Sequence, residues 1–596
     1  MWTTLIFPCI QKREETLTAR NKTLNSLKYH INQIFPLLQD VATYSREKFK
    51  GDLSAGLTVG VMLIPQGMAY ALIAGLPPQY GLYASVVPLL IYAFLGTSKH
   101  LGIGPVALIA LLVASAVAPI AETPDEYIAL SILLALMVGV LQFSFGLMRM
   151  GFLVNLLSHP VLSGFVSAAA IIIGLSQLHH ILGVGSVTGG LHDILYGIAL
   201  QVSDLNVLTL ATGAGAIALI VFAKKKLPAL PGPVLAVAAG ILFIYLTGLH
   251  EAGVAVVGEI NRGLPALVMP AIEWVTIMQL MPMAVAIALV AFMESIAVGK
   301  AIQQKSKEYK INSNKELIAL GAANIGGSLF QAFPVTGSFS RTAINYETGA
   351  KTGITGLISA AVVAVTLLFL TPLFYYLPNA VLGAIIIVAV FGLIDYKEFK
   401  RLWKIGHYDR YMFLATFAGT LFVGIKEGIL LGVTLSVIML LYRSARPNHA
   451  VIGKIPGTSV YRSIKRYETE QDPDVVVFRF DAPLHFANAE YFREKVNELI
   501  IERSGTACMV LDLNGVNEID STGLDELLET MKDLGEKKIA VKLAEVKAPV
   551  RDMLKSSSNT DKEWTFYMQI EDAIMSFSDS EKKENETTYT IHLDTK

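Results

Sequence analysis

The sequence predicts a polytopic α-helical membrane domain of about fourteen spans, followed by a soluble α/β domain. Hydrophobic residues make up 53% of the 596 residues and charged residues only 16%, and the mean hydropathy is +0.52. Apolar segments with few charges recur from residue 54 to residue 443. After Arg446 the composition changes to short apolar runs that alternate with amphipathic segments, a pattern typical of soluble α/β domains.

The polar residues 1–50 carry no cleavable signal pattern, so the first span is expected to act as its own insertion signal. Apolar segments then follow in two sets of about seven, separated by a polar interval. The first set comprises residues 54–73, 79–96, 105–118, 127–148, 156–181, 206–223 and 231–248. The second set comprises residues 278–302, 314–331, 338–347, 353–376, 379–394, 408–424 and 427–443.

The charges between these segments predict the orientation of the chain. With the N-terminus inside, the inner loops contain most of the basic residues, namely Lys99, Arg149, Lys224–Lys226, Lys305–Lys315, Lys351 and Lys397–Arg410. The outer loops are mainly acidic, with Glu122, Asp125, Glu126, Glu251 and Glu259, and with Arg262 and Lys426 as exceptions. This positive-inside pattern predicts a multi-pass protein of the cell membrane (inner or plasma membrane), with both termini in the cytoplasm.

Two short segments at matching positions indicate an internal inverted repeat. The segments after Pro105 and after Pro334 are both short and both follow a proline. Gln66 precedes Pro105 by 39 residues, and Glu294 precedes Pro334 by 40 residues. Each set as listed has seven spans. Because seven is odd, the two halves have opposite orientations in the membrane. Two half-helices then enter from opposite sides, and their N-termini meet near the midplane, where they favour an anion.

The stretch from Phe333 to Ala343 is the predicted centre of the function. It lies at membrane depth, yet it contains a proline, a glycine, four hydroxyl residues and Arg341. An uninterrupted helix fits only from about Ser338 to Glu347, which is roughly 15 Å, or half of a ~30 Å hydrocarbon core. The unpaired N–H groups of this half-helix, its dipole, the serines and Arg341 converge on one place. We expect an anion there; the alternative is a proline-kinked helix packed on its neighbours.

Several motifs resemble a known family. Pro65–Ala71 and Gly75–Tyr83 are similar to the signature of the sulfate permease (SulP) family, which includes the animal solute-carrier anion transporters. Further similar motifs are Gly102–Pro105, Glu316–Gly321 and Ser338–Arg341, and the resemblance covers about residues 50 to 578. It implies an inverted repeat of about seven plus seven spans with core and gate subdomains, and a homodimer. It also implies a C-terminal STAS domain (sulfate transporter and anti-sigma factor antagonist).

Arg341 is the first candidate for anion binding, because an arginine at membrane depth is costly and marks a functional site. Its alternative role is to pair with Glu294 or with backbone carbonyl groups of the broken helix. In the resembled family the residue that matches Arg341 lies by the anion pocket, and a pocket-lining serine precedes it, as Ser340 does here. Ser338 and Ser340 either bind the anion or cap the half-helix. The backbone N–H groups of Phe339 and Ser340 are further donors.

The first half of the repeat supplies the other predicted contacts. The N–H groups of Val106 and Ala107 are expected to face the same site, with Pro105 as the first helical residue. Gln66 and Tyr70 lie four residues apart on one helix face and offer an amide and an aromatic wall. Ordinary core packing is the alternative role for Tyr70.

Glu294 is predicted to couple transport to a proton. A carboxyl group buried beside an anion can bind a proton, which relieves the repulsion and carries the proton with the substrate. A Na⁺ site could use the same acid. In the Na⁺-coupled, bicarbonate-transporting branch of the family a hydroxyl residue follows the acid one turn later, but this position is Val298 here. A structural ion pair with Arg341 is the remaining alternative.

Neither a metal, a cofactor, an enzymatic activity nor nucleic-acid binding is predicted. His179 and His180 have no third ligand nearby in the sequence and are interpreted as interfacial residues. Cys9 and Cys508 cannot build a disulfide framework. The net charge of −1 gives no indication of nucleic-acid binding, and no hydrolytic or phosphoryl-transfer motif is present.

The C-terminal region predicts a parallel arrangement of strands and helices. Buried strands are expected at residues 475–480 and 507–512, and amphipathic helices at residues 490–503 and 523–534. The loop Asp520–Gly523 resembles the STAS loop in which a serine, here Ser521, is phosphorylated in anti-sigma antagonists. In this chain we favour an N-cap role instead, in which Asp520 or Ser521 caps the following helix. A phosphate at this position would still be favoured by the helix N-terminus.

The predicted organisation has four parts: a cytoplasmic N-terminal region (1–50), a transmembrane anion transport domain (51–446), a STAS domain (447–578) and a disordered tail (579–596). The predicted function is secondary active transport of an inorganic anion, with sulfate and proton symport as the first expectation. Bicarbonate, chloride or dicarboxylate transport or exchange, coupled to protons or Na⁺, is the alternative. Glu294 disfavours an anion channel or a motor, and an intact Glu294 and Arg341 disfavour a purely regulatory protein.

Overall fold

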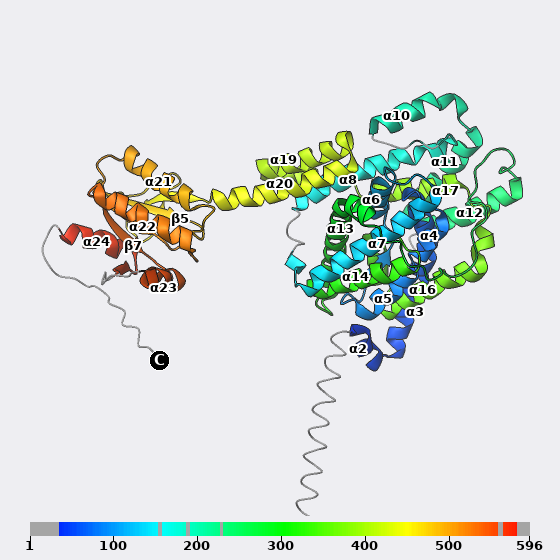
Figure 1. Cartoon of the computed structure of the whole chain (residues 1–596), viewed down its shortest axis with the longest axis horizontal. Helices are drawn as coiled ribbons and strands as arrows, with labels where there is room; N and C mark the ends of the chain where they lie inside the picture. The colour runs from blue at the N-terminus through cyan, green and yellow to red at the C-terminus, as the bar shows by residue number, and fades with distance from the viewer. Residues whose placement is uncertain are drawn as a thin grey trace, which may run out of the picture. The chain divides into compact units, whose positions relative to one another are not determined.

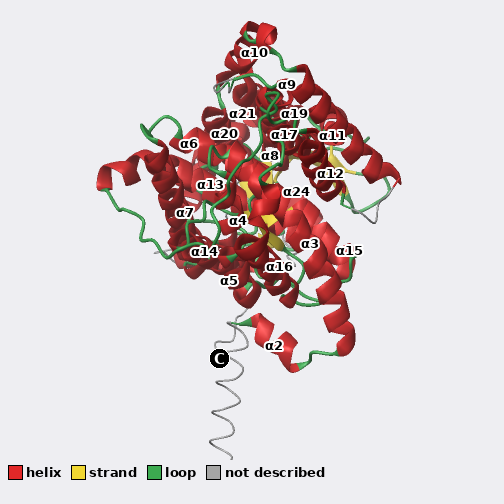
Figure 2. Ribbon diagram, turned by 90° about the vertical axis from the view of Figure 1, so that its right-hand side faces the viewer, coloured by secondary structure: helices red, strands yellow, loops and turns green. Residues whose placement is uncertain are grey.

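The computed structural model describes residues 35–152, 158–185, 187, 191–226, 231–557 and 564–580. The chain divides into two compact units, Met1–Ser436 and Val437–Lys596 (Figure 1). The first unit is built mainly of helices, and the second contains a six-stranded sheet (Figure 2). Residues 1–34 of the predicted N-terminal region and residues 581–596 of the predicted tail lie outside the described residues. The last described helix extends to Ser580, two residues into the predicted tail.

Each predicted span contains a helix of the first unit. The helices of the first half are α2 (Pro36–Ala42), α3 (Arg46–Ile73), α4 (Pro78–Tyr83), α5 (Val87–Leu95), α6 (Ala107–Val117), α7 (Pro124–Leu147), α8 (His159–Ser176), α9 (Leu178–Leu182), α10 (Leu191–Leu200), α11 (Val207–Lys226) and α12 (Gly232–Thr247). Those of the second half are α13 (Trp274–Ser306), α14 (Ser313–Leu329), α15 (Phe339–Glu347), α16 (Ile354–Val365), α17 (Asn379–Phe391), α18 (Tyr396–Ile405), α19 (His407–Ala418) and α20 (Ile425–Ala445). Within the described ranges, nine helices have the length and composition to cross a membrane.

Two helical segments continue as π-helix, Thr366–Leu370 after α16 and Gly419–Val423 after α19. These continuations extend two short helices toward the lengths predicted for their spans. Helix α10 and the amphipathic helix α18 were not predicted, because neither is apolar and long enough to appear as a span.

The helices of the first unit pack in two groups. In one group α14 packs on α7 and α5, α16 packs on α3, and α13 contacts α6, α7 and α15. In the other group α19 packs on α8, and α11 packs on α12 and α17. Contacts of α17 and α12 with α3, and of α8 with α6, join the two groups. All predicted anion-site residues belong to elements of the first group.

Two short strands pair with each other inside the first group of helices. Strand β1 (Gly102–Gly104) pairs antiparallel with β2 (Thr336–Ser338), and Ile103 lies opposite Gly337. Helix α6 begins three residues after β1, and α15 begins directly after β2. Each strand thus leads into one of the two predicted half-helices, and the antiparallel pairing is the arrangement that an inverted repeat requires.

The second unit is an α/β domain with sheet order β4-β3-β5-β6-β7-β8. The strands are β3 (His449–Lys454), β4 (Tyr461–Ser463), β5 (Val475–Phe480), β6 (Cys508–Asp512), β7 (Ala540–Ala544) and β8 (Phe566–Tyr567), and the helices are α21 (Ala489–Glu502), α22 (Ser521–Glu536), α23 (Ala548–Ser557) and α24 (Ile570–Ser580). β5 to β8 run parallel, while β3 is antiparallel to both β4 and β5. Strands β5 and β6 and helices α21 and α22 closely match their predicted ranges.

Candidate functional site

The N-termini of α6 and α15 lie at opposite ends of the paired strands β1 and β2. Val106 is the residue before α6, in an extended conformation, and Ala107 begins the helix. Ser338 occupies the equivalent position before α15, which Phe339 begins. The first N–H groups of both helices have no carbonyl partner within their own helix. Two sets of backbone donors and two positive helix dipoles therefore flank one region of the protein.

The position of Pro105 differs from the prediction. It was expected to be the first helical residue, but α6 begins two residues later, at Ala107. β1 ends at Gly104, so Pro105 lies in the extended connection between the strand and the helix. Its carbonyl oxygen accepts a hydrogen bond from Arg341 Nη1 at 3.0 Å. Pro105 thus orients the arginine instead of starting the helix.

Arg341 is the largest of the fully buried side chains of the described residues, with 0% exposure. Its Nη1 group binds the Pro105 carbonyl, whereas Nε and Nη2 are buried without a hydrogen-bond partner. Buried donors of a charged group without a partner are costly. The guanidinium group therefore presents unsatisfied N–H donors to whatever binds beside it.

Two glycines leave the space that Arg341 occupies. A Cβ atom at Gly102 would lie 2.8 Å from the Cβ atom of Arg341, closer than side chains approach. A Cβ atom at Gly104 would lie 3.4 Å from Arg341 Nη2, and Gly104 also has a φ of +144°, which L-residues rarely adopt. The close approach of Arg341 therefore explains Gly102, whereas the positive φ of Gly104 explains the second glycine.

Gln66 and Tyr70 lie on α3, which contacts both α6 and α15. Both side chains are buried, with 5% and 7% exposure. Gln66 Oε1 has no hydrogen-bond partner, and the Tyr70 hydroxyl lies within range of the charges of Arg341 and Glu294. The two residues thus share the surroundings of Arg341, as their spacing predicts.

Glu294 lies in the middle of α13, which contacts both half-helices. Its Oε2 atom is buried without a hydrogen-bond partner. Within the described residues no hydrogen bond or ion pair within 4.0 Å joins Glu294 to Arg341. The alternative of a structural ion pair between them is therefore not seen here, and both groups keep atoms without a partner among the described residues. Val298, one turn later, is a buried aliphatic side chain.

The three residues at the start of α15 differ in exposure. Ser338 is buried, with 7% exposure, whereas Phe339 is 59% exposed and Ser340 is also exposed. The Ser338 hydroxyl does not cap the helix; it lies 3.3 Å from the Ser340 hydroxyl. The capping alternative for Ser338 is thus wrong, and its hydroxyl group pairs with that of Ser340 at the start of the half-helix.

A buried polar network that the sequence did not predict holds the loop before α15. Asn324 on α14 accepts from Val335 N–H at 2.8 Å and donates to the Val335 carbonyl at 3.2 Å. Gln142 on α7 accepts from Asn324 Nδ2 at 3.0 Å. Ser295, next to Glu294, accepts from Gly337 N–H at 2.9 Å. Thr336 donates to the Ala291 carbonyl at 2.6 Å. These amides and hydroxyls are spread over four elements, so no local motif reveals them.

The groups around Arg341 suit an anion. His179 and His180 are adjacent on α9, with ring centroids 3.9 Å apart. Across the described ranges, no group of three His, Cys, Asp or Glu side chains comes together to hold a metal ion. Near Arg341 the unsatisfied groups among the described residues are instead guanidinium nitrogens, the amide oxygens of Gln66 and Asn345 and one carboxyl oxygen of Glu294. A small anion can accept from the guanidinium donors.

The second unit carries the other predicted site, the loop before α22. Asp520 precedes the helix; its Oδ1 accepts from Gly523 N–H at 2.7 Å and its Oδ2 accepts from Phe486 N–H at 2.9 Å. Asp520 thus caps α22 and also holds the loop at Phe486. Ser521 is the first residue of the helix and is exposed. The cap is therefore Asp520, and the alternative that Ser521 caps the helix is wrong.

We expect Asp520→Ala to cost about 1 kcal/mol or more of stability of this unit, because one carboxylate serves two backbone N–H groups. Ser521→Ala should change that stability by less than about 0.5 kcal/mol, as at most exposed positions, and should leave transport by the purified protein unchanged. Denaturant unfolding and uptake by both variants check this. Loss of uptake in Ser521→Ala with normal expression would instead assign a regulatory role to the loop.

Asp512, at the end of β6, is expected to make the stability of the second unit depend on pH. Its side chain is only 3% exposed, and this burial raises the pKa of Asp512 to about 6. An unfolded aspartate has a pKa of about 3.9. The protonated carboxyl group therefore favours folding below about pH 4, and this contribution is lost as the pH rises through about 6. We expect Asp512→Asn to reduce the pH dependence of the unfolding free energy in this window; an unchanged dependence would exclude Asp512 as its source.

Comparisons of the sequence agree with this architecture. The profile of the "Sulfate permease family" matches residues 49–416, and that of the "STAS domain" matches residues 466–573. Sulfate transporter 4.1, chloroplastic, of Arabidopsis thaliana is 39% identical, and the alignment covers 94% of this chain and 84% of the relative. A protein of Mycobacterium tuberculosis described as a probable sulfate transporter is 36% identical, over 90% of this chain and 96% of the relative.

Solved structures are similar over the same range. The murine Slc26a9 anion transporter in the inward-facing state matches with a TM-score of 0.85 and 26% identity, over 93% of this chain and 95% of that chain. The transmembrane domain of the cyanobacterial bicarbonate transporter BicA matches with a TM-score of 0.58 and 25% identity, over 66% of this chain and 98% of that chain. The predicted combination of a polytopic helical membrane domain and an α/β domain is thereby confirmed.

Proposed function

The chain belongs to the sulfate permease family, and we propose that this anion transporter carries sulfate by symport with a proton. The observation that carries the proposal is the fully buried Arg341, whose Nε and Nη2 donors have no partner between two half-helix N-termini. A tetrahedral oxyanion accepts several hydrogen bonds at once, so it can satisfy both guanidinium donors and backbone N–H groups of α6 and α15.

The proposed anion site consists of side chains from α3 and α15 and backbone groups of the two half-helices. Its members are Gln66, Tyr70, Val106, Ala107, Ser338, Phe339, Ser340 and Arg341. Sulfate is favoured as the substrate because relatives from a plant and a bacterium carry the name of sulfate transporters. A divalent anion also gains most from two helix dipoles and one guanidinium group.

Glu294 is the proposed proton carrier. Its buried Oε2 atom has no hydrogen-bond partner and no ion pair with Arg341, so protonation is the means by which it can lie beside an arriving anion. A Na⁺ ion is less well supplied with ligands. Val298 has no oxygen in its side chain, and the hydroxyl groups of Ser295 and Thr336 bind each other at 2.9 Å.

We propose that the protein lies in the cell membrane with both termini in the cytoplasm, in line with the positive-inside pattern of its loops. We also propose that it works as a homodimer, as its resemblance to the family implies. Ser521 stays a candidate for phosphorylation, because its exposed position at the N-terminus of α22 would stabilise a phosphate group. Mass spectrometry of the protein from its native cells tests this modification.

The test of the proposed function is uptake into proteoliposomes. Radiolabelled sulfate, bicarbonate and fumarate are compared under an acid-outside pH gradient and, separately, under a Na⁺ gradient at symmetric pH. We expect sulfate to accumulate with the pH gradient and not with the Na⁺ gradient. Accumulation of bicarbonate that requires Na⁺ would replace the proposal.

A further inference from the structure

Two buried carboxylates of the first unit have no role in the transport proposed above. Asp52 on α3 is 0% exposed and Glu316 on α14 is 1% exposed. Among the described residues neither forms an ion pair with a basic side chain; all their contacts are hydrogen bonds from backbone N–H groups and hydroxyl groups. A buried charge is costly unless it is hydrogen-bonded. The groups that donate to these two carboxylates therefore indicate which segments the carboxylates hold in place.

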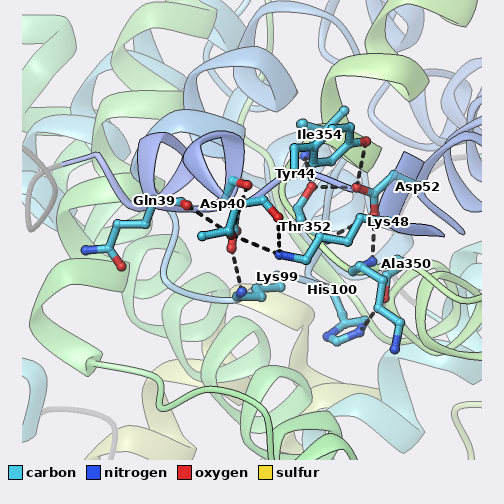
Figure 3. Close-up of polar contacts among 12 residues, drawn as sticks. Gln39, Asp40, Tyr44, Lys48, Asp52, Lys99, His100, Ala350, Thr352 and Ile354 are labelled. Atoms are coloured by element: carbon cyan, nitrogen blue, oxygen red, sulfur yellow. Dashed lines mark hydrogen bonds and ion pairs between the residues drawn. The ribbon is translucent and has the colours of Figure 1, made fainter. Parts of the chain in front are cut away.

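Asp52 binds the turn that follows the half-helix α15. Its Oδ1 accepts from the N–H groups of Lys351 at 2.6 Å and Thr352 at 3.0 Å, and from the hydroxyl of Thr355 at 3.1 Å. Its Oδ2 accepts from the hydroxyls of Thr352 at 2.5 Å and Tyr44 at 3.1 Å. Figure 3 shows the Tyr44 hydroxyl directed at this carboxylate. Lys351 lies only four residues after Glu347, the last residue of α15.

Glu316 binds the turn that precedes strand β1. Its Oε1 accepts from the N–H groups of Thr97 at 2.7 Å and Ser98 at 3.1 Å, and also from the Thr97 hydroxyl. Its Oε2 accepts from the Tyr92 hydroxyl at 2.7 Å. Ser98 lies four residues before Gly102, the first residue of β1. Each carboxylate therefore anchors the end of one of the two segments that form the anion site.

The two anchored turns are also tied to each other. Asn345 on α15 donates to the His100 carbonyl at 3.0 Å, and His100 Nε2 lies 3.0 Å from the carbonyl oxygen of Ala350 (Figure 3). The Gly102 N–H donates to the hydroxyl of Thr342, the residue after Arg341, at 3.1 Å. The connection before β1 and the half-helix α15 thus form one hydrogen-bonded body with a carboxylate at each end.

Each carboxylate lies on a helix that contributes to the site elsewhere along its length. Helix α3 carries Asp52 and, further along, Gln66 and Tyr70. Helix α14 carries Glu316 and, further along, Asn324, which holds Val335 before β2. The bonds of Asp52 therefore fix α3 relative to α15. The bonds of Glu316 fix α14 relative to β1.

We propose that Asp52 and Glu316 are positioning residues for the anion site: they set the distances among Gln66, Arg341 and the start of α6 by anchoring both site segments. This inference rests on the proposed function of the same site. The carboxylates act as hydrogen-bond acceptors, and neither carries a coupling ion. Their charge is therefore dispensable, whereas their acceptor geometry is not.

The hydrogen-bond pattern makes the amide variants a sharp test. In Asp52→Asn the remaining oxygen can occupy the place of Oδ1, and the new NH₂ group faces the hydroxyls of Tyr44 and Thr352, which can accept as well as donate. In Glu316→Gln the NH₂ group faces the Tyr92 hydroxyl, which can likewise reverse its role. The alanine variants lose every one of these bonds and leave buried backbone N–H groups unpaired.

The experiment measures sulfate binding by calorimetry and uptake kinetics in proteoliposomes for Asp52→Ala, Asp52→Asn, Glu316→Ala and Glu316→Gln. Size-exclusion chromatography and thermal unfolding show which variants are folded. We expect the alanine variants to raise Kd and KM at least about tenfold; a tenfold rise in Kd corresponds to about 1.4 kcal/mol of binding free energy. The change in maximal rate should be smaller. The amide variants should stay within about threefold of the parent.

Three results would overturn the proposal. Amide variants as defective as the alanine variants would show that the charge itself is needed. Folded alanine variants with a normal KM and a lowered maximal rate would assign the carboxylates to the movement of the protein instead of the site. If the alanine variants do not fold, Tyr92→Phe and Thr355→Val each remove one donor, and an unchanged KM in both would also exclude a positioning role.

A parent protein that does not bind sulfate contradicts only the proposed substrate, and the series is then repeated with the anion that the parent takes up.

Discussion

Arg341→Ala is expected to weaken sulfate binding at least about 100-fold and to abolish uptake. Two nitrogen atoms of the guanidinium group, Nε and Nη2, have no hydrogen-bond partner among the described residues. A hydrogen bond to a charged group contributes about 1.5–3 kcal/mol, and about 1.4 kcal/mol corresponds to a factor of ten in affinity. Losing both donors therefore removes at least about 3 kcal/mol from the binding of the anion. Calorimetric titration of the purified variant with sulfate measures the loss.

Arg341→Lys is the matched variant, because it keeps the positive charge but lacks the planar set of donors. We expect it to bind sulfate more weakly than the parent and more tightly than Arg341→Ala. Thermal unfolding of both variants separates loss of the site from loss of the fold, since Arg341 also binds the Pro105 carbonyl. A folded Arg341→Ala protein that binds sulfate as tightly as the parent would make Arg341 a structural residue and move the site elsewhere.

The half-helices could be predicted from the sequence because their signals are local. A proline and a glycine at membrane depth shorten the helix, and a span of half the usual length follows directly. Helix α15, Phe339–Glu347, begins one residue after the predicted start. Arg341 and Glu294 were identifiable for a similar reason, since ionisable residues are rare in membrane spans.

The bonds that hold the site could not be predicted, because they join residues far apart in the chain. The pairing of β1 with β2 connects residues 102–104 to residues 336–338, and strands of three residues leave no periodic pattern. Asn324 and Gln142 look like ordinary polar residues on apolar helices until α14 packs on α7 and brings them within 3.0 Å. Pro105 was misplaced because proline suits both a first helical turn and an extended connection.

The residue that caps α22 also could not be identified from the sequence alone. The sequence Asp520-Ser521-Thr522-Gly523 predicts an N-cap but leaves open which residue provides it. The structure assigns the cap to Asp520, because its Oδ1 accepts from the Gly523 N–H. Its second oxygen also binds the Phe486 N–H, which is 34 residues away, and this tertiary contact could not be predicted from the loop sequence.

Glu294→Gln is expected to uncouple transport from the proton gradient while preserving anion binding. If Glu294 carries the proton, its charge is lost in one part of the cycle and regained in another. Sulfate then binds more tightly when the carboxyl group is protonated, and by linkage the proton binds more tightly when sulfate is present. Sulfate affinity of the parent should therefore rise as the pH falls. Glutamine has the shape of the protonated acid but cannot release a proton, so the affinity of the variant should be high and independent of pH.

Uptake under an acid-outside gradient is the decisive measurement for Glu294→Gln. The parent should accumulate sulfate above equilibrium, whereas the variant should only exchange labelled for unlabelled sulfate across the membrane, because exchange needs no titrating group. Replacing Na⁺ by K⁺ should change neither protein, since Val298 provides no oxygen ligand beside the acid and the neighbouring hydroxyls of Ser295 and Thr336 bind each other. Accumulation by the variant equal to that of the parent would exclude Glu294 as the proton carrier. Parent uptake that requires Na⁺ and ignores the pH gradient would instead make this carboxylate part of a Na⁺ site.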